Sequence, residues 1–143
     1  MIIRPMTCMD IDDIWNLEKK IFKDPWRKEA FEYEVNNPKI SYPCVIEKDS
    51  IILGYAVVWN FADETHIGNF AVHPDYRHQG LGKILMEHLL NKFSDSKTMY
   101  LEVRKSNQAA KLLYESFGFR NLYVREKYYS DGEDAIVMCK DLT

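Results

Sequence analysis

The stretch that most constrains the fold is residues 69–82, NFAVHPDYRHQGLG, where a hydrophobic segment runs into a turn that contains glycines. The residues that follow, LGKILMEHLLNKF, repeat apolar side chains at helical spacing. The sequence therefore predicts a strand, a tight turn and a helix that begins on Gly80 and Gly82. Such a helix start exposes backbone N–H groups and carries positive dipole potential.

A turn of this kind is suited to binding phosphate, and Arg77 and Lys83 would add positive charge to it. We therefore interpret residues 77–82 as a binding loop for a phosphorylated cofactor. The alternative is a strand-to-helix turn with no ligand. The spacing matches neither the P-loop pattern GxxxxGK[ST] nor the dinucleotide pattern GxGxxG, so a second motif is needed to choose a cofactor.

Length and composition limit the remaining possibilities. A chain of 143 residues with 46% hydrophobic residues predicts one compact domain spanning residues 1–143. The net charge of −3 gives no support for nucleic-acid binding, and no apolar run or signal peptide points to a membrane. Three scattered cysteines predict reduced thiols in a cytoplasmic protein, and the four histidines lack metal-ligand spacing, so no metal is expected.

Patterning along the chain predicts seven strands and four helices. The strands are expected at residues 1–4, 42–47, 51–59, 65–72, 98–104, 123–129 and 134–140. Helices are expected at residues 11–22, 27–35, 82–93 and 107–116. This order predicts an α/β (α+β) protein with a mixed sheet and helices on its faces.

The second motif is LEVRKSNQAAKLLYESFGF, residues 101–119. Strand alternation places Glu102 and Arg104 on one face, and Asn107 stands at the N-cap position of the next helix. Tyr114 falls on the apolar face of that helix. From the residues alone, Glu102 is equally an ion-pair partner of Arg104, and Tyr114 is first of all a core residue.

Three segments, AVHPDYRHQGLG, LEVRKSNQAAKLLYESFGF and the ending YYSDGEDAIVMCKDL, resemble the GCN5-related N-acetyltransferases, the GNAT family. They are most similar to its α-amino acetyltransferases of the bacterial ribosomal-protein-alanine type and their archaeal relatives. The resemblance implies the GNAT fold, a mostly antiparallel sheet of about seven strands whose two central strands splay apart, with four helices. It also implies acetyl-CoA as the donor.

The resemblance assigns roles to individual residues. It implies Glu102 as general base, Tyr114 as the acid that protonates the leaving thiolate, and the Val72 N–H as an oxyanion donor. His66 is a candidate proton relay, with a surface or structural histidine as the alternative. The residues implied in acetyl-CoA binding are Phe70, Ala71, Val72, Arg77, His78, Gln79, Gly80, Leu81, Gly82, Lys83 and Asn107.

The acceptor side carries weaker signals. Pro25 and Trp26, in the break between the first two helices, are candidates for a pocket that receives the first residue of a peptide, and Trp26 is equally a core residue. Tyr128 and Tyr129 are candidates for binding the peptide, and alternation in a strand would let only one of them face it.

The implied function is acetylation of a protein N-terminus, specifically the N-terminal alanine of a ribosomal protein. The alternatives are an α-N-acetyltransferase of broader specificity, a small-molecule amine acetyltransferase and a non-catalytic CoA-binding module.

Overall fold

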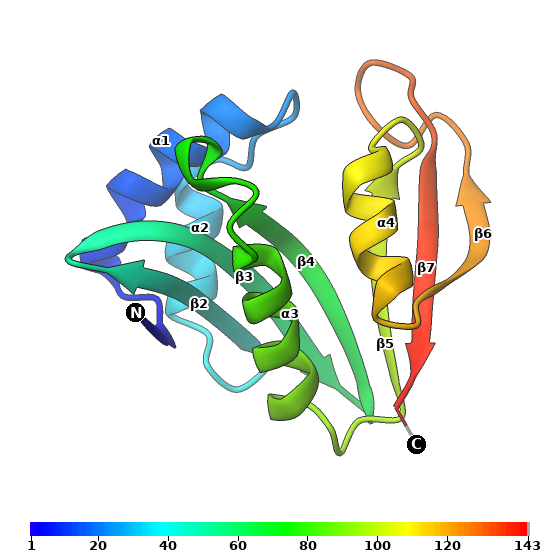
Figure 1. Ribbon diagram of the computed structural model, residues 1–143, viewed down its shortest axis with the longest axis horizontal. Helices are drawn as coiled ribbons and strands as arrows, with labels where there is room; N and C mark the ends of the chain where they lie inside the picture. The colour runs from blue at the N-terminus through cyan, green and yellow to red at the C-terminus, as the bar shows by residue number, and fades with distance from the viewer. Residues whose placement is uncertain (143) are drawn as a thin grey trace.

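A computed structural model describes residues 1–142 of the chain (Figure 1). The strands are β1 (Ile2–Pro5), β2 (Ser41–Lys48), β3 (Ile51–Phe61), β4 (Glu64–Val72), β5 (Thr98–Arg104), β6 (Arg120–Arg125) and β7 (Ala135–Asp141). The helices are α1 (Ile11–Ile21), α2 (Lys28–Val35), α3 (Leu81–Lys92) and α4 (Gln108–Ser116), with short 3₁₀ turns η1 (Cys8–Asp10) and η2 (Pro74–Tyr76). The predicted order of elements is confirmed.

All seven strands form one sheet in the order β1-β2-β3-β4-β5-β7-β6. Every neighbouring pair is antiparallel except β4 and β5, which run parallel at the centre. A parallel pair needs a crossover connection, and α3 supplies it. This mixed sheet with four helices confirms the predicted fold class.

The two central strands pair over only part of their length. Backbone pairing joins Glu64 through Ile67 of β4 to Thr98 through Leu101 of β5, and beyond that point the strands diverge (Figure 1). The divergence begins at Gly68, which is an extra residue in the register between β3 and β4 because Ile67 pairs with Val58 and Asn69 with Val57. Such a β-bulge bends a strand and increases its twist.

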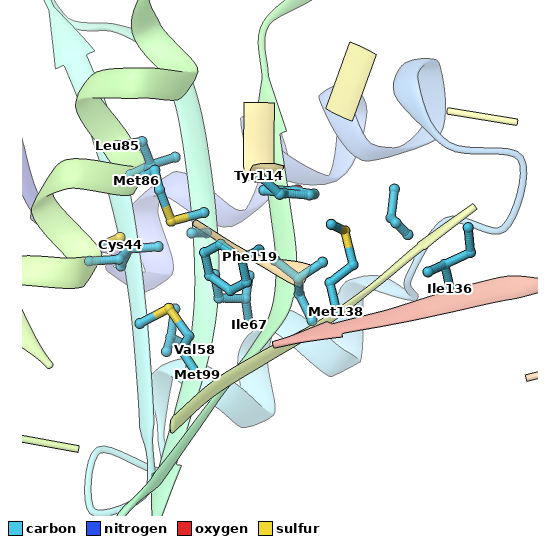
Figure 2. Close-up of a cluster of buried hydrophobic side chains, with 14 residues drawn as sticks. Cys44, Val58, Ile67, Leu85, Met86, Met99, Tyr114, Phe119, Ile136 and Met138 are labelled. Atoms are coloured by element: carbon cyan, nitrogen blue, oxygen red, sulfur yellow. The ribbon is translucent and has the colours of Figure 1, made fainter. Parts of the chain in front are cut away.

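Helices cover both faces of the sheet, and each face has its own core. On one face, α1 and α2 pack Ile14 and Phe31 against Tyr55 and Val57 of β3. On the other face, α3 and α4 pack the cluster shown in Figure 2, which includes Leu85, Met86 and Tyr114 with Ile67 and Met138 of the sheet. The bulge decides which core each β4 side chain joins, because Ile67 faces α3 and α4 whereas Ala71 faces α1 and α2.

One strand differs from the prediction. A strand was expected over residues 123–129, but β6 ends at Arg125, and Tyr128 and Tyr129 lie in the loop before β7. The backbone leaves the extended conformation at Lys127, whose φ is 51°. The Lys127 N–H donates to the Asp134 carboxylate at 2.9 Å, which holds the loop in that conformation. Because Tyr128 and Tyr129 are not in a strand, the alternation of side chains along a strand does not decide which of them faces the peptide.

Candidate active site

A cavity of about 540 Å³ occupies the split between β4 and β5. Its walls come from both faces of the sheet: Phe22 and Trp26 after α1 on one side, and Gly82 of α3 with Tyr114 of α4 on the other. Because the two central strands stop pairing here, the cavity passes through the plane of the sheet. Groups bound on opposite faces can therefore meet at this point.

The N-terminus of α3 forms one end of the cavity. Gly80, the N-cap, has a φ of 77°, in the left-handed region that favours glycine. The first helical hydrogen bond runs from the Ile84 N–H to the Gly80 carbonyl at 3.0 Å, so the preceding N–H groups of the helix have no intrahelical acceptor. The first turn of the helix holds no acidic residue. This end is therefore electropositive, with the side chains of Arg77 and Lys83 beside it.

A side chain at Gly82 would crowd the cavity. A Cβ placed there would lie 3.2 Å from Leu113 Cδ2 on α4. Glycine thus keeps open the space between the α3 N-terminus and α4. Asn107 also lines the cavity and caps α4, because its side-chain oxygen accepts from the Ala110 N–H at 3.2 Å.

Tyr114 reaches the cavity from α4. Its ring is buried and packs edge-on against Phe70 of β4, with ring centroids 5.9 Å apart. Burial raises the pKa of the Tyr114 hydroxyl, so that this group stays protonated at neutral pH. Tyr114 is thus both a core residue and a wall of the cavity, so the two interpretations from sequence are compatible.

Glu102 lies where the strands diverge, one residue beyond the last paired position of β5. Its Oε2 atom is 2.7 Å from Nε2 of His66 on β4, and its side chain is 15% exposed. The alternative that Glu102 pairs with Arg104 is wrong, because Arg104 instead contacts Asp24, Asp131 and Glu133. A carboxylate and an imidazole in hydrogen-bond contact beside a cavity can accept and pass on a proton.

The structure separates the remaining sequence candidates. Of the acceptor candidates, Trp26 and Tyr129 line the cavity, whereas Pro25 and Tyr128 are exposed and lie outside it. Gln79 is exposed and also lies outside, and His66 reaches the cavity only through Glu102. The other donor-side candidates line the cavity: Phe70, Ala71, Val72, Arg77, His78, Gly80, Leu81, Gly82, Lys83 and Asn107.

Sequence reasoning missed Glu18 of α1, which lines the cavity and is only 1% exposed. The Tyr55 hydroxyl and the Asn69 amide donate to its Oε1 at 2.7 and 3.0 Å. The Trp26 N–H donates to its Oε2 at 3.0 Å. Burial raises the pKa of this carboxyl group, and the three donors oppose that shift. A charged residue on the apolar stripe of a helix was the signal for it in the sequence.

Two features are absent from residues 1–142. No helix in this range is long and apolar enough to cross a lipid bilayer. The same residues contain no group of three or more His, Cys, Asp or Glu side chains placed to hold a metal ion.

The split sheet, the electropositive helix end and the carboxylate beside the cavity suit an enzyme that binds a phosphorylated ligand on one face of the sheet and a second molecule on the other. The acetyltransferase (GNAT) family model matches residues 11–119. The chain belongs to this family and is an N-acetyltransferase, and the acyl donor of the family is acetyl-CoA.

Individual relatives agree with this assignment over nearly the whole chain. A Bacillus subtilis protein named "Putative ribosomal protein bS18-alanine N-acetyltransferase" is 38% identical over 139 residues, 95% of this chain and 92% of its own length. The crystal structure of the ribosomal-protein-S18-alanine N-acetyltransferase from Escherichia coli aligns with a TM-score of 0.91 at 33% identity, covering 99% of this chain and 94% of that one. A chain of the NatC complex bound to Gag peptide and CoA aligns with a TM-score of 0.83 at 25% identity, covering 99% and 98%.

Proposed function

We propose that this chain, as one acetyltransferase domain, transfers acetyl from acetyl-CoA to the N-terminal amine of a protein, specifically the N-terminal alanine of a ribosomal protein. The observation that carries the proposal is the cavity through the split sheet, which has an anion-binding helix end on one face and Glu102 with His66 at the point of divergence. The names of the Bacillus and Escherichia relatives support the acceptor.

The donor would bind along β4 and the N-terminus of α3. The backbone N–H groups at the start of α3 would receive the pyrophosphate, together with Arg77. The edge of β4 from Phe70 to Val72 has no partner in β5. Its main-chain groups are therefore free of that strand and would pair with the amides of the pantetheine arm, as a neighbouring strand does.

The acceptor would enter from the opposite face, between Trp26 and Tyr129. Glu102, with His66, would take the proton released when the acceptor ammonium becomes a neutral amine. Bound acetyl-CoA supplies the thioester carbonyl that the amine attacks. The Val72 N–H would stabilise the oxyanion, and the protonated Tyr114 hydroxyl would donate to the departing thiolate. The second proton, which the attacking nitrogen loses as the amide forms, would restore the Tyr114 hydroxyl.

The proton balance suits an α-amine. A peptide N-terminus has a pKa of about 7.7–8.0, so forming the neutral amine at pH 7 costs about 1 kcal/mol. For a lysine side chain, with a pKa of about 10.4, forming the neutral amine at pH 7 costs about 5 kcal/mol. One carboxylate paired with one histidine is sufficient base for the first reaction.

A panel of peptides that differ only in the first residue tests the proposal. With acetyl-CoA, release of free thiol should be fastest for peptides that begin with alanine, and mass spectrometry should locate the acetyl group on the terminal nitrogen. Equal rates for several first residues would replace this acceptor with a broader set of protein N-termini. Acetylation only of internal lysines or of small amines would reject the proposed acceptor.

The Glu102→Gln variant tests the assigned base. It should lower turnover about 10²- to 10⁴-fold, because the amide cannot accept the proton. Glu34→Gln is a matched control, since Glu34 is also buried but only accepts a hydrogen bond from Trp59, which glutamine can still accept. Unchanged turnover of Glu102→Gln at every pH would return Glu102 to a structural role.

A further inference from the structure

Two loops meet at the acceptor end of the cavity, one from each half of the split sheet. The loop between α1 and α2, residues 22–27, belongs to the half that contains β4, and the loop between β6 and β7, residues 126–134, belongs to the half that contains β5. Both loops lie at the open end of the split (Figure 1). No backbone pairing joins β4 and β5 at that end, so side chains must hold the two loops together.

Arg104, the last residue of β5, makes this connection. Its Nη2 donates to Asp24 of the first loop at 2.8 Å, and its Nη1 donates to Asp131 at 2.9 Å and to Glu133 at 2.8 Å in the second. The Ser130 hydroxyl donates directly to Asp24. We call these five residues, Asp24, Arg104, Ser130, Asp131 and Glu133, the acceptor clasp.

The clasp differs from an ordinary surface ion pair in its burial and geometry. The Arg104 side chain is only 16% exposed, and its two terminal nitrogens contact carboxylates of different loops. A planar guanidinium can hold several carboxylates at fixed angles, which an ammonium group cannot. The Arg104 guanidinium also stacks on Tyr129, with its Cζ atom 4.1 Å from the centroid of the tyrosine ring. The clasp is therefore a directional connection across the split.

Its members adjoin the residues that form the acceptor walls. Asp24 lies two positions before Trp26, and Tyr129 lies beneath Arg104 and next to Ser130. Asp24, Trp26, Arg104 and Tyr129 all line the cavity. The separation of the Trp26 and Tyr129 walls is consequently fixed by the same contacts that join the loops.

We propose that Arg104 is a positioning residue that sets the width of the acceptor entrance by clasping Asp24 to the loop between β6 and β7. This inference rests on the proposed function, because it assigns the acceptor to the space between Trp26 and Tyr129. It predicts that the clasp governs the affinity for the acceptor peptide and has little influence on acetyl-CoA or on the chemical step.

The Asp24→Asn variant removes the charge that pairs with Arg104 and so weakens the connection of the first loop, leaving only the exposed Lys23–Asp131 ion pair at 3.8 Å. We expect the KM for an alanine-starting peptide to rise about tenfold, while the KM for acetyl-CoA and kcat at saturating peptide stay within about twofold. Arg104→Lys should have a similar effect, and the double variant should be no worse than either single one, because both remove the same connection. Asp24→Glu, which keeps the carboxylate, should restore much of the affinity.

Asp12→Asn is the matched control. Asp12 pairs with Lys28 at 2.6 Å and joins α1 to α2, but it lies outside the cavity. The same chemical change there should leave the peptide KM unchanged. A normal peptide KM in Asp24→Asn, or an equal rise in the control, would overturn the proposal.

Hydrogen exchange separates the failure of this inference from failure of the proposed function. Releasing Asp24 should increase amide exchange in residues 126–134, which belong to the other half of the sheet, whether or not the peptide is a substrate. If the wild-type protein acetylates no N-terminal peptide, the proposed acceptor fails but this measurement still tests the clasp. Unchanged exchange in residues 126–134 would show that the two loops are not coupled.

Discussion

Replacing Gly68 by alanine should show how strongly the split in the sheet depends on one residue. Gly68 is the bulge residue of β4, and a Cβ there would meet three atoms of the six-membered ring of Trp59 at 2.4, 2.6 and 2.8 Å. Ordinary contact begins at 3.4 Å, so the indole would have to move by about 1 Å. Alanine at position 68 therefore cannot be accommodated without displacing Trp59.

The indole has little freedom to move. Its Nε1 donates to Glu34 at 2.8 Å, and its ring stacks on Trp26 at a centroid distance of 6.1 Å. Overpacking costs about 1–3 kcal/mol, and losing a hydrogen bond to a carboxylate costs about 1.5–3 kcal/mol. We therefore expect Gly68→Ala to lower the free energy of unfolding by about 2.5–6 kcal/mol.

The assay is thermal unfolding followed by circular dichroism, with urea unfolding as an independent measure. With an unfolding entropy of about 2.1 cal/mol/K per residue, 143 residues give about 0.3 kcal/mol/K, so Tm should fall by about 8–20 °C. Trp59 also contacts His66 edge-on at 5.6 Å, so the contact of His66 with Glu102 should be disturbed and turnover should fall.

A double-mutant cycle with Trp59→Phe isolates the cause. Phenylalanine lacks the three ring atoms that the new methyl group would meet, so Gly68→Ala should cost less than about 1 kcal/mol in that background. If alanine at position 68 lowers stability equally with tryptophan and with phenylalanine at position 59, the steric explanation is wrong.

Three other variants test separate parts of the site. Tyr114→Phe should lower kcat about 10²-fold with unchanged circular dichroism, and full activity would remove it as the acid. Arg77→Ala should raise the KM for acetyl-CoA about tenfold. The KM for acetyl-pantetheine, which lacks the pyrophosphate, should stay unchanged, and an equal rise for both donors would contradict a contact between Arg77 and the pyrophosphate. Burial raises the pKa of Glu18 in the folded protein, so its proton favours folding at low pH, and this contribution is lost as pH rises through the raised pKa. Urea unfolding should therefore show the wild-type protein losing stability relative to Glu18→Gln as the pH rises above 4.5, the ordinary pKa of a glutamate. The loss should be at most about 1.4 kcal/mol per pH unit. A stability difference that stays constant with pH would contradict a raised pKa of Glu18.

The sequence was most informative where the determinants of structure are local. The glycine turn before α3, the Asn107 cap and the order of elements each depend on residues within one or two turns of each other, and all are found in the structure. The end of β6 was misplaced because it depends on Asp134, which accepts from the Lys127 N–H across the loop before β7. Contacts between distant residues leave no such periodic signal.

The same distinction applies to the site. Glu102 was singled out from its motif, but its contact with His66 joins residues 36 positions apart, and Arg104 reaches Asp24 across 80 positions. Glu18 was missed because its three donors come from β3, β4 and the loop after α1. Only the fold brings these groups together, so no local pattern could assign their partners.

The short ladder between β4 and β5 has a consequence for folding as well as for chemistry. Four residue pairs join the backbones of the two halves of the sheet, and the core under α3 and α4 is the apolar cluster that spans both halves. A ligand that contacts both halves adds a further connection where β4 and β5 are unpaired, so its binding energy also opposes their separation. At a hundred times its dissociation constant such a ligand stabilises the native state by about 2.7 kcal/mol. The occupied protein should therefore unfold as a more cooperative unit than the free one, with the two halves linked through the ligand.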